Sequence, residues 1–446
     1  MTRFLPCPLP CNCDKHEESS HKSQLNNQIS DTSSSNSSLT SHPSLPSVPS
    51  LEHAASAAAA AAAANHHCLA TLKGHSSYVF SLALVGKHLY SGASDGEIRA
   101  WDRGSLGHAA TARGCSAVKS ITVLGGKIIT AHGDHRIRVW RINDHLHQTQ
   151  TQNRGHFSII TVGSDSNNPV TTAAVRLKLA ATLPTAGDRC MRLFSAGSYV
   201  EVRRHRRRTW VHHADAVAAL AASADGALLY SVSWDRSMKV WRSSDFRCVE
   251  SVQAAHDDAI NAVAAAVDGS VYTGSADRLI KVWRRRDGER RHSLVATLER
   301  HKSAVNALAL STDGNTLYSG ACDRSIIVWE KGGAAAGGGG MVVAGALRGH
   351  KRSILCLAVA AELLCSGSAD GSVRVWRRGS GNSHSCVAVL EGHKCPVKCL
   401  VACLDRSYSE VKKNDDATAD LGNNYLVYSG GMDFDIKVWK IWVPSL

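Results

Sequence analysis

The sequence predicts an all-β protein in which a seven-bladed β-propeller follows a disordered N-terminal tail. Three observations predict this fold: an Asp is followed six residues later by a Trp in seven places, a Ser or Thr stands four residues before each Asp, and short strand-like runs alternate with turn signals. Self-similarity at a fixed period is typical of repeat architectures. Units of roughly 40–45 residues with four short strands are typical of propeller blades.

One unit, residues 298–329, shows the expected strands most clearly. An apolar or alternating run covers 304–310, a second run covers 316–320 and a third covers 325–329. Asp313-Gly314 and Asp323-Arg324 lie between these runs, where residues of this kind favour turns. We expect a fourth strand between each Trp and the next His, which completes a four-stranded antiparallel sheet.

The spacing of the seven Trp residues indicates which blades carry insertions. Successive Trp residues are 39, 101, 42, 46, 47 and 63 positions apart. We therefore expect the propeller over 67–443, with insertions at about 143–198, 331–345 and 405–424, the last one between the first and second strands of its blade. The longest interval does not predict an eighth blade, because His156 precedes Asp165 by only 9 residues and no Trp follows. Structureless loops of such length are usually functional or disordered.

Residues 1–66 differ in composition from the rest of the chain. Ser, Asn, Pro and His dominate as far as Pro49, and an Ala-rich tract follows over 54–64. Such a segment buries too little apolar surface to offset its ordering entropy, so we expect a disordered tail. Cys7, Cys11, Cys13 and His16 are metal-ligand types, but a zinc site needs firmly placed ligands. We expect neither a metal nor any other cofactor.

Charge and cysteine usage narrow the cellular setting. The chain of 446 residues carries a formal charge of +13, which favours acidic partners or nucleic acid but says nothing about fold. Its 14 Cys residues show no disulfide-like framework, and several lie in apolar runs. No secretory signal and no apolar run of membrane-spanning length is visible. We expect a monomer that does not bind membranes, in the cytoplasm, the nucleus or both.

A His stands four residues before the first Val or Ile of the first strand in six units, and Gly114 stands there in the second. We expect each Asp to accept a hydrogen bond from the His, the His to bond the Ser or Thr hydroxyl, and that hydroxyl to bond the Trp indole. A hydrolase also uses Ser, His and Asp, but a catalytic set would not be copied around a ring. The structural sets are His75, Ser91, Asp95 and Trp101; Thr130, Asp134 and Trp140; His213, Ser231, Asp235 and Trp241; His256, Thr273, Asp277 and Trp283; His301, Ser319, Asp323 and Trp329; His350, Ser366, Asp370 and Trp376; and His393, Ser429, Asp433 and Trp439.

On these residues the chain resembles the WD40-repeat family over roughly 67–443. The resemblance implies a closed seven-bladed ring in which residues 68–72 pair with 436–439 as the outer strand of the last blade. Gly114 departs from the family pattern, so we expect the second blade to be the loosest. More narrowly, three segments are similar to plant Jingubang-type WD-repeat proteins: Tyr199-Val-Glu-Val-Arg-Arg-His205, Ser231-Val-Ser-Trp-Asp-Arg236 and Ala255-His-Asp-Asp-Ala-Ile-Asn261.

The resemblance implies a platform that binds peptides or protein domains on the narrow face, around the central channel. Three positions of each blade point there in the family: three and five residues after the His, and the residue before the Asp. Trp234 is the sharpest candidate, because other repeats hold small residues in this turn, although a Trp folded back on its own blade is an alternative. The predicted partner-binding residues are Tyr78, Phe80, Lys119, Trp234, Asn261, Asn306, Cys322, Leu355, Lys398 and Met432.

The basic run 203–208 has three interpretations. It falls where we expect the exposed outer strand of the second blade, and charges on an edge strand prevent sheet-to-sheet aggregation. A run of this kind is also typical of nuclear import signals and nucleic-acid patches. No stacking aromatic residues are interleaved with it, which weakens the case for RNA.

A non-catalytic, regulatory scaffold that binds other proteins is the function that the sequence favours. A substrate receptor of a cullin-type ubiquitin ligase is one alternative, but such receptors resemble one another in a Trp-Asp-x-Arg ending, and Trp101-Asp102-Arg103 places the Arg one position early. An RNA- or DNA-binding propeller is the other alternative. We expect no enzyme, because the sequence shows no phosphate loop, metal cluster or nucleophile elbow.

Overall fold

A computed structural model of the chain describes residues 50, 64–143, 175–193, 199–203, 206–286, 288–289, 291–332, 340–379, 383–405 and 422–444. Cys7, Cys11, Cys13 and His16, and with them most of the expected tail, lie outside the described residues. So do 144–174, 333–339 and 406–421, which make up much of the expected insertions.

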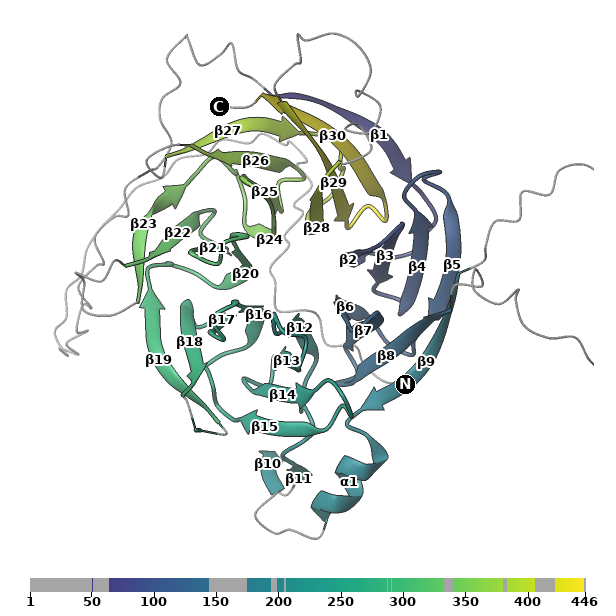
Figure 1. Cartoon of the computed structure of the whole chain (residues 1–446), viewed down its shortest axis with the longest axis vertical. Helices are drawn as coiled ribbons and strands as arrows, with labels where there is room; N and C mark the ends of the chain where they lie inside the picture. The colour runs from purple at the N-terminus through teal and green to yellow at the C-terminus, as the bar shows by residue number, and fades with distance from the viewer. Residues whose placement is uncertain are drawn as a thin grey trace, which may run out of the picture. The chain divides into compact units, whose positions relative to one another are not determined.

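Seven four-stranded antiparallel sheets stand side by side in a ring, which confirms the predicted seven-bladed propeller (Figure 1). The first strand of each blade lies nearest the ring centre and the fourth lies outermost. The blades are β2–β5 (Val79–Val85, His88–Ala93, Glu97–Asp102, His108–Arg113), β6–β9 (Val118–Leu124, Lys127–His132, Ile137–Asn143, Arg176–Leu183), β12–β15 (Val217–Ala222, Leu228–Ser233, Met238–Arg242, Cys248–Val252), β16–β19 (Ile260–Ala265, Val271–Ser275, Leu279–Arg285, His292–Glu299), β20–β23 (Val305–Leu310, Thr316–Ala321, Ile326–Lys331, Met341–Leu347), β24–β27 (Ile354–Ala360, Leu363–Ser368, Val373–Arg378, His384–Leu390) and β28–β30 (Val397–Leu404, Gly422–Gly431, Ile436–Pro444) with β1 (Asn65–Leu72).

The last blade is closed by the first strand of the chain. β1 pairs antiparallel with β30, with Cys68 opposite Trp439 and Leu72 opposite Ile436. This register confirms the predicted pairing of 68–72 with 436–439. The first and the last strand of the propeller therefore lie in the same sheet, and the hydrogen bonds between them close the ring.

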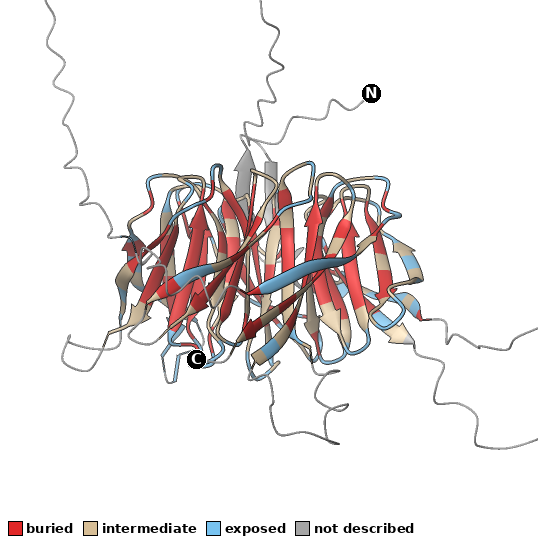
Figure 2. Cartoon of the chain, turned by 90° about the horizontal axis from the view of Figure 1, so that it is seen from above, coloured by how far each residue is buried: buried red, intermediate tan, exposed pale blue. Residues whose placement is uncertain are grey.

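The hydrophobic core is divided among the seven contacts between blades. Each of seven clusters of buried side chains draws on two neighbouring blades, and buried residues fill the middle of every sheet (Figure 2). The first residue of every inner strand is completely buried: Val79, Val118, Val217, Ile260, Val305, Ile354 and Val397. Burial of apolar area is the main stabilising term, so each blade depends on both of its neighbours.

The outer strand of the second blade differs from the prediction. β9, residues Arg176–Leu183, pairs with β8 and occupies the fourth position, with Leu179 opposite Trp140. The basic residues Arg206–Arg208 instead belong to β11 (Arg206–Thr209), which pairs with β10 (Tyr199–Arg203) in a separate two-stranded sheet beside the helix α1 (Ala186–Leu193). The interpretation of the basic run as the protected edge of the second blade is therefore wrong.

The outer strand of the second blade was placed wrongly for a physical reason. The outer strand carries none of the four repeated side chains, so a strand inside an insertion has no motif to mark it. Its apolar alternation, with Leu183 completely buried against the third blade, is the only local signal.

Several element bounds shift by a few residues from the expected ones. β1 begins at Asn65 and Ala64 is already buried in a core cluster, so ordered structure begins before residue 67. β23 begins at Met341 and β29 at Gly422, which shortens two of the expected insertions. Ser50 forms an isolated parallel bridge with Ala346 on the outer strand β23. No helix among the described residues is long and apolar enough to cross a membrane.

Candidate functional site

Blades three to seven bring together the four side chains that the sequence repeats. In these blades the His Nδ1 lies 2.8–3.2 Å from an Asp oxygen, and the His Nε2 lies 2.8–2.9 Å from the Ser or Thr hydroxyl. The Trp indole N–H donates to the same hydroxyl at 2.8–2.9 Å. The Asp accepts from Nδ1–H, so Nε2 accepts the hydroxyl proton and every group of the set has a partner.

These sets are poor candidates for chemistry because their hydroxyls are inaccessible. All seven Ser or Thr hydroxyl residues, from Ser91 to Ser429, are completely buried. Burial alone would raise the pKa of Asp235, but hydrogen bonds from His213, Ser237 and a backbone amide together hold it well below its usual value. A buried, fully satisfied network of this kind rigidifies a fold, and no substrate atom can reach its hydroxyl.

The first blade does not use the predicted Asp. His75 Nδ1 lies 3.2 Å from Glu97 Oε2, while Asp95 accepts a hydrogen bond from Ser76 at 3.0 Å. Glu97 is 6% exposed and is also paired with Arg99. The side chain two residues after the Asp thus takes over the contact with the imidazole, and the only signal for it in the sequence is an acid at that position.

In the second blade, His132 supplies the imidazole, because Gly114 stands at the position where the other blades have their His. His132 is completely buried, its Nε2 lies 2.7 Å from Thr130 Oγ1, and its Nδ1 lies 2.9 Å from the Ser116 carbonyl oxygen. Trp140 donates to Thr130 at 2.9 Å, as in the other blades. A Cβ at Gly114 would lie 2.9 Å from the His132 ring, so the glycine makes room for the displaced imidazole. Although Gly114 led us to expect the second blade to be the loosest, its Thr130 hydroxyl contacts both an imidazole and an indole, as in the other blades.

Burial keeps the imidazoles of these two blades neutral. Desolvation lowers the pKa of His132 to about 4, against a partial opposing effect of its hydrogen bond to Ser116. Desolvation likewise lowers the pKa of His75 to about 4, although the Glu97 charge acts in the other direction.

The position five residues after the His is a β-bulge in all seven inner strands. Each first strand loses its register with the second strand at this residue, between the fully buried Val or Ile and the next paired residue. A bulge leaves one residue unpaired and re-aims its side chain. The seven bulge residues are Phe80, Lys119, Ala218, Asn261, Asn306, Leu355 and Lys398.

Four aromatic rings and one lysine form a continuous cluster across four blades. Lys119 Nζ lies 4.6 Å from the centre of the Phe80 ring and 5.0 Å from the centre of the Trp234 ring. Tyr78 lies 6.2 Å from Phe80 and 5.5 Å from Phe434, measured between ring centres. We call Tyr78, Phe80, Lys119, Trp234 and Phe434 the aromatic–lysine cluster. The Trp234 ring of the third blade thus lies beside a lysine of the second blade.

Phe434 is a member that the sequence reasoning missed. It follows Asp433 in the turn before β30, has φ of 69° and is 39% exposed. A bulky residue with positive φ is a rare conformation, and residues at the same turn position of other blades are Gly, His or Arg. The available signal was an aromatic residue at a turn position where core packing requires none.

The remaining predicted contact residues divide by role. Asn261 donates to the Val305 carbonyl at 3.0 Å and Asn306 donates to the Ile354 carbonyl at 2.8 Å, so these two amides join neighbouring blades. Asn306 also donates to Cys322 Sγ at 3.2 Å, and Leu355 is only 8% exposed. Lys398 and Met432 are half-buried at the same end of the blades as the cluster.

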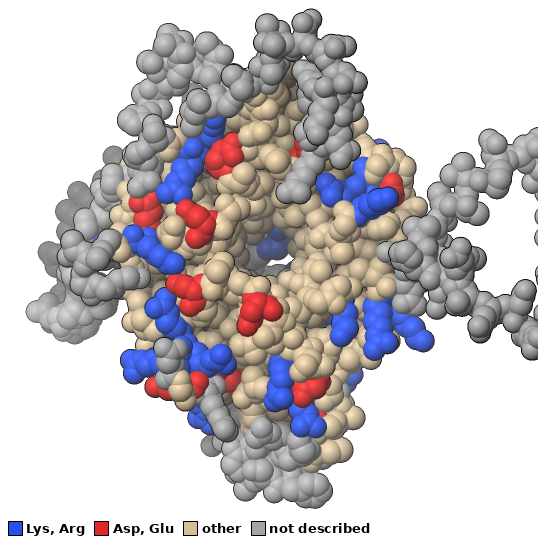
Figure 3. Space-filling view, viewed as in Figure 1, with Lys and Arg blue, Asp and Glu red and all other residues tan. Residues whose placement is uncertain are grey.

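Acidic side chains also lie at the opposite end of the blades. On the face drawn in Figure 3, several acidic side chains lie closer to the central opening than most Lys and Arg side chains do. The turns between first and second strands, which lie away from the cluster, include Asp225, Asp268, Asp313 and Glu362. Many of these acids are paired, as in the Lys331–Asp268 contact of 3.1 Å between two blades.

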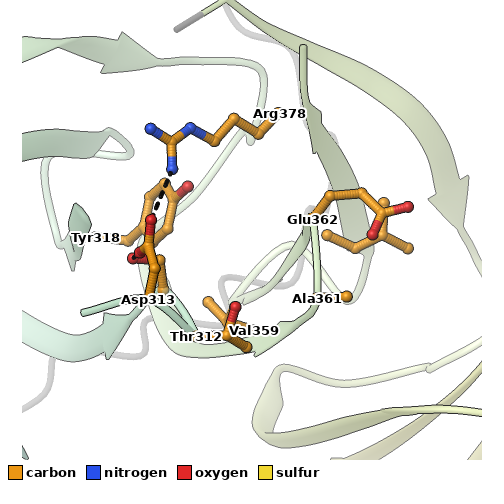
Figure 4. A pocket seen from close by; sticks show the side chains of 9 residues that line it. Thr312, Asp313, Tyr318, Val359, Ala361, Glu362 and Arg378 are labelled. Carbon is orange, nitrogen blue, oxygen red and sulfur yellow. Dashed lines mark hydrogen bonds and ion pairs between the residues drawn. The ribbon is translucent and has the colours of Figure 1, made fainter. Parts of the chain in front are cut away.

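A small hollow lies at that end between the fifth and sixth blades (Figure 4). It has a volume of about 290 Å³, and Asp313, Glu362, Tyr318 and Arg378 line it. Arg378 lies 3.9 Å from Asp313, so the ionic groups of the hollow serve the contact between blades. Within the part of the chain that the structure describes, no group of three or more His, Cys, Asp or Glu side chains is placed to hold a metal ion.

Comparison with known proteins agrees with this architecture. The family model described as "WD domain, G-beta repeat" matches residues 66–102, 204–242, 246–284, 292–330, 342–377 and 384–440, which is more than half of the chain. The protein is a member of the WD40 family. The matches leave out the second blade, where Gly114 and the longest insertion depart from the repeat pattern. WD40 propellers generally bind other proteins and are generally non-catalytic.

Individual relatives are similar at low identity. Striatin-4 from Homo sapiens is 25% identical over 218 residues, which is 48% of this chain and 28% of the relative. Cilia- and flagella-associated protein 52 from Chlamydomonas reinhardtii is 24% identical over 55% of this chain and 37% of the relative. The ribosome biogenesis protein WDR12 homolog of the same alga is 30% identical over 28% of this chain and 30% of the relative. The chain thus spans about a third of the length of these curated relatives.

Proposed function

We propose that this WD40 protein is a non-catalytic scaffold that binds a protein partner on the face that carries the aromatic–lysine cluster. The observation that supports it best is the continuity of the cluster, from Phe434 through Tyr78 and Phe80 to Trp234, with Lys119 between two rings. Four blades contribute to this one surface. The fold does not require these rings, because equivalent positions elsewhere hold Ala, Gly or Ser.

The composition of the cluster suits binding. Interface energy concentrates in a few aromatic and basic anchors near the centre of a contact surface. Tyr78 is 45% exposed, so a partner that covers its ring removes apolar surface from water, which favours binding. The bulge geometry places Phe80 and Lys119 on inner strands, which are rigid elements, so a partner would meet a preorganised surface.

Affinity purification with matched variants tests this proposal. Trp234→Ala and Phe80→Ala should each remove a set of proteins that the wild type captures, while their melting temperatures stay within a few degrees of the wild type. Leu294→Ala is the control, because Leu294 is 46% exposed on an outer strand away from the cluster. Capture that is the same for all four proteins would show that the partner binds elsewhere.

The role of the protein in the cell and its location are inferred from the resemblance of its sequence. We infer a regulatory role in the cytoplasm or the nucleus. We also propose that the protein is of the plant Jingubang type, which three segments of the sequence resemble. The identity of the captured proteins and the distribution of the tagged protein in cells are the measurements that check this inference.

A further inference from the structure

We propose that the partner presents an acidic segment with an apolar or aromatic side chain at its centre, and that this segment lies across the aromatic–lysine cluster and the basic residues around it. This inference rests on the proposed scaffold function and gives its partner a chemistry. The carboxylates would meet the cations of the face, and the apolar side chain would cover the exposed rings.

The charge of Lys119 is the first argument. The Phe80 and Trp234 rings attract its ammonium group through their π faces, so the positive charge is held in place between two apolar rings. Holding the long side chain between two rings also reduces the entropy that it would lose on binding a carboxylate. A fixed cation surrounded by apolar surface favours an anionic partner.

A row of arginines is the second argument. Arg236, Arg278 and Arg324 follow the repeated Asp in three consecutive blades, at the turn position that Phe434 holds in the last blade. All three are exposed and have φ of 67–75°, so one turn geometry projects them from the same end of the ring as Phe434. The residues just after the repeated His extend the basic surface over the last three blades with four exposed cations: Lys302, Lys351, Arg352 and Lys394.

The exposed rings are the third argument. Tyr78 and Phe434 are in contact with each other and are 45% and 39% exposed. Partner carboxylates alone would leave this apolar surface in water, whereas one aromatic or aliphatic side chain would bury both rings at once.

The acids of the face favour a peptide over a nucleic acid. Asp215, Asp257 and Asp258 are exposed just after the repeated His of the third and fourth blades, next to the arginine row. A continuous phosphate backbone would have to pass these carboxylates, and like charges in close contact are costly. A peptide can place its few carboxylates over the cations and leave uncharged residues near the acids.

Fluorescence anisotropy with defined probes tests the proposal on the full-length protein. The first probe is a fluorescein-labelled peptide of about ten residues with four Glu around one central Phe. The others replace the Phe with Gly, replace every Glu with Lys, or are single-stranded RNA of the same net charge. The acidic Phe peptide should bind most tightly and should weaken as salt rises. The Gly peptide should bind about tenfold more weakly, and the Lys peptide should not bind.

Variants assign the binding to the face. Lys119→Gln and Phe434→Ala should each weaken binding of the acidic Phe peptide about tenfold. Arg278→Gln should also weaken it and should make binding less dependent on salt. Arg247→Gln is the charge control, because Arg247 is 53% exposed in the loop at the other end of its blade, and it should leave binding unchanged. The melting temperature of every variant is measured alongside.

The outcomes separate this inference from the scaffold function. Equal binding of acidic and basic peptides, or loss with Arg247→Gln as large as with Lys119→Gln, would overturn the acidic partner. Tighter binding of the RNA than of any peptide would also overturn it and would favour a nucleic-acid ligand. If Trp234→Ala loses captured proteins while no acidic peptide binds, the scaffold function stands and only the partner chemistry is wrong.

Discussion

At the scale of single residues, every blade places an imidazole against the buried Ser or Thr hydroxyl. The histidine that supplies this imidazole does not always come from the same position of the repeat. Glu97 replaces the Asp contact in the first blade and His132 replaces the missing His in the second. The indole–hydroxyl hydrogen bond is kept in both, from Trp101 at 2.8 Å and Trp140 at 2.9 Å. What the fold maintains is a satisfied hydroxyl between the first and third strands, because an unsatisfied buried polar group is costly.

His132→Ala should destabilise the protein by about 2–3 kcal/mol, because it removes a buried hydrogen bond to Thr130 and leaves a cavity beside Gly114. Thermal or urea unfolding measures the loss. His67→Ala is the control, because His67 is an exposed histidine on β1, and it should change the stability by less than about 0.5 kcal/mol. Equal effects of the two substitutions would show that the His132 side chain does not contribute to the free energy of unfolding.

The role of some candidate binding residues could be predicted from the sequence, and the role of others could not. Trp234 was predictable because a large aromatic residue stood where other repeats have small ones. Phe434 was open to the same reasoning, but it follows the repeated Asp and so lies two residues after Met432, the position that the family uses in this blade. The role of Asn261 was not predictable, because only the packed blades show that its amide reaches the Val305 carbonyl.

At the scale of the blade, a glycine in the second strand allows the next blade to pack closely against it. A Cβ at Gly320 would lie 2.5 Å from Ile354 Cγ2 of the next blade, and one at Gly274 would lie 2.7 Å from Val305 Cγ1. In five of the seven blades a glycine follows the Ser or Thr, and it lets the first residue of the next inner strand pack directly on the backbone. The strands predicted over 304–310, 316–320 and 325–329 match β20, β21 and β22 within two residues, whereas β9 was missed because outer strands carry no motif.

Gly320→Ala should therefore destabilise the contact between the fifth and sixth blades by about 1–3 kcal/mol through overpacking. Gly104→Ala is the matched control, because a Cβ there would come no closer than 3.4 Å to its nearest neighbour, Asp102 Oδ1. Urea unfolding of the two variants provides the measurement. A Gly320→Ala protein as stable as the control would mean that the neighbouring blades separate without cost.

The whole ring combines seven apolar contacts with ionic contacts between some of the blades. Lys331 reaches Asp268 of the preceding blade, Arg378 reaches Asp313, and Arg103 donates to Tyr428 at 3.3 Å across the junction of the last and first blades. Exposed pairs of this kind contribute little each, so the ring depends mainly on burial. Because every blade packs against two others, the described part of the propeller should lose its structure cooperatively.

Stability of the whole propeller should fall as pH drops from about 6.5 to about 4. The folded state holds His75 and His132 neutral, with a pKa of about 4 for each, while the unfolded chain takes up a proton near the ordinary value of 6.5. Unfolding therefore binds protons in this window, and the stability that each His contributes above pH 6.5 is lost as the pH falls through it, up to about 3 kcal/mol per group.

Urea unfolding midpoints between pH 7.5 and pH 4.5 measure this loss. The aspartates, such as Asp277 and Asp433, have a pKa below the usual value despite the opposing effect of burial, so their contribution should persist until the pH falls below about 4. The pH dependence above 4.5 should thus come from the imidazoles, and His132→Gln should flatten it. An unchanged slope in that variant would mean that His132 is already protonated in the folded ring, and the hydrogen bond from the Thr130 hydroxyl to its Nε2 would then have to be reversed.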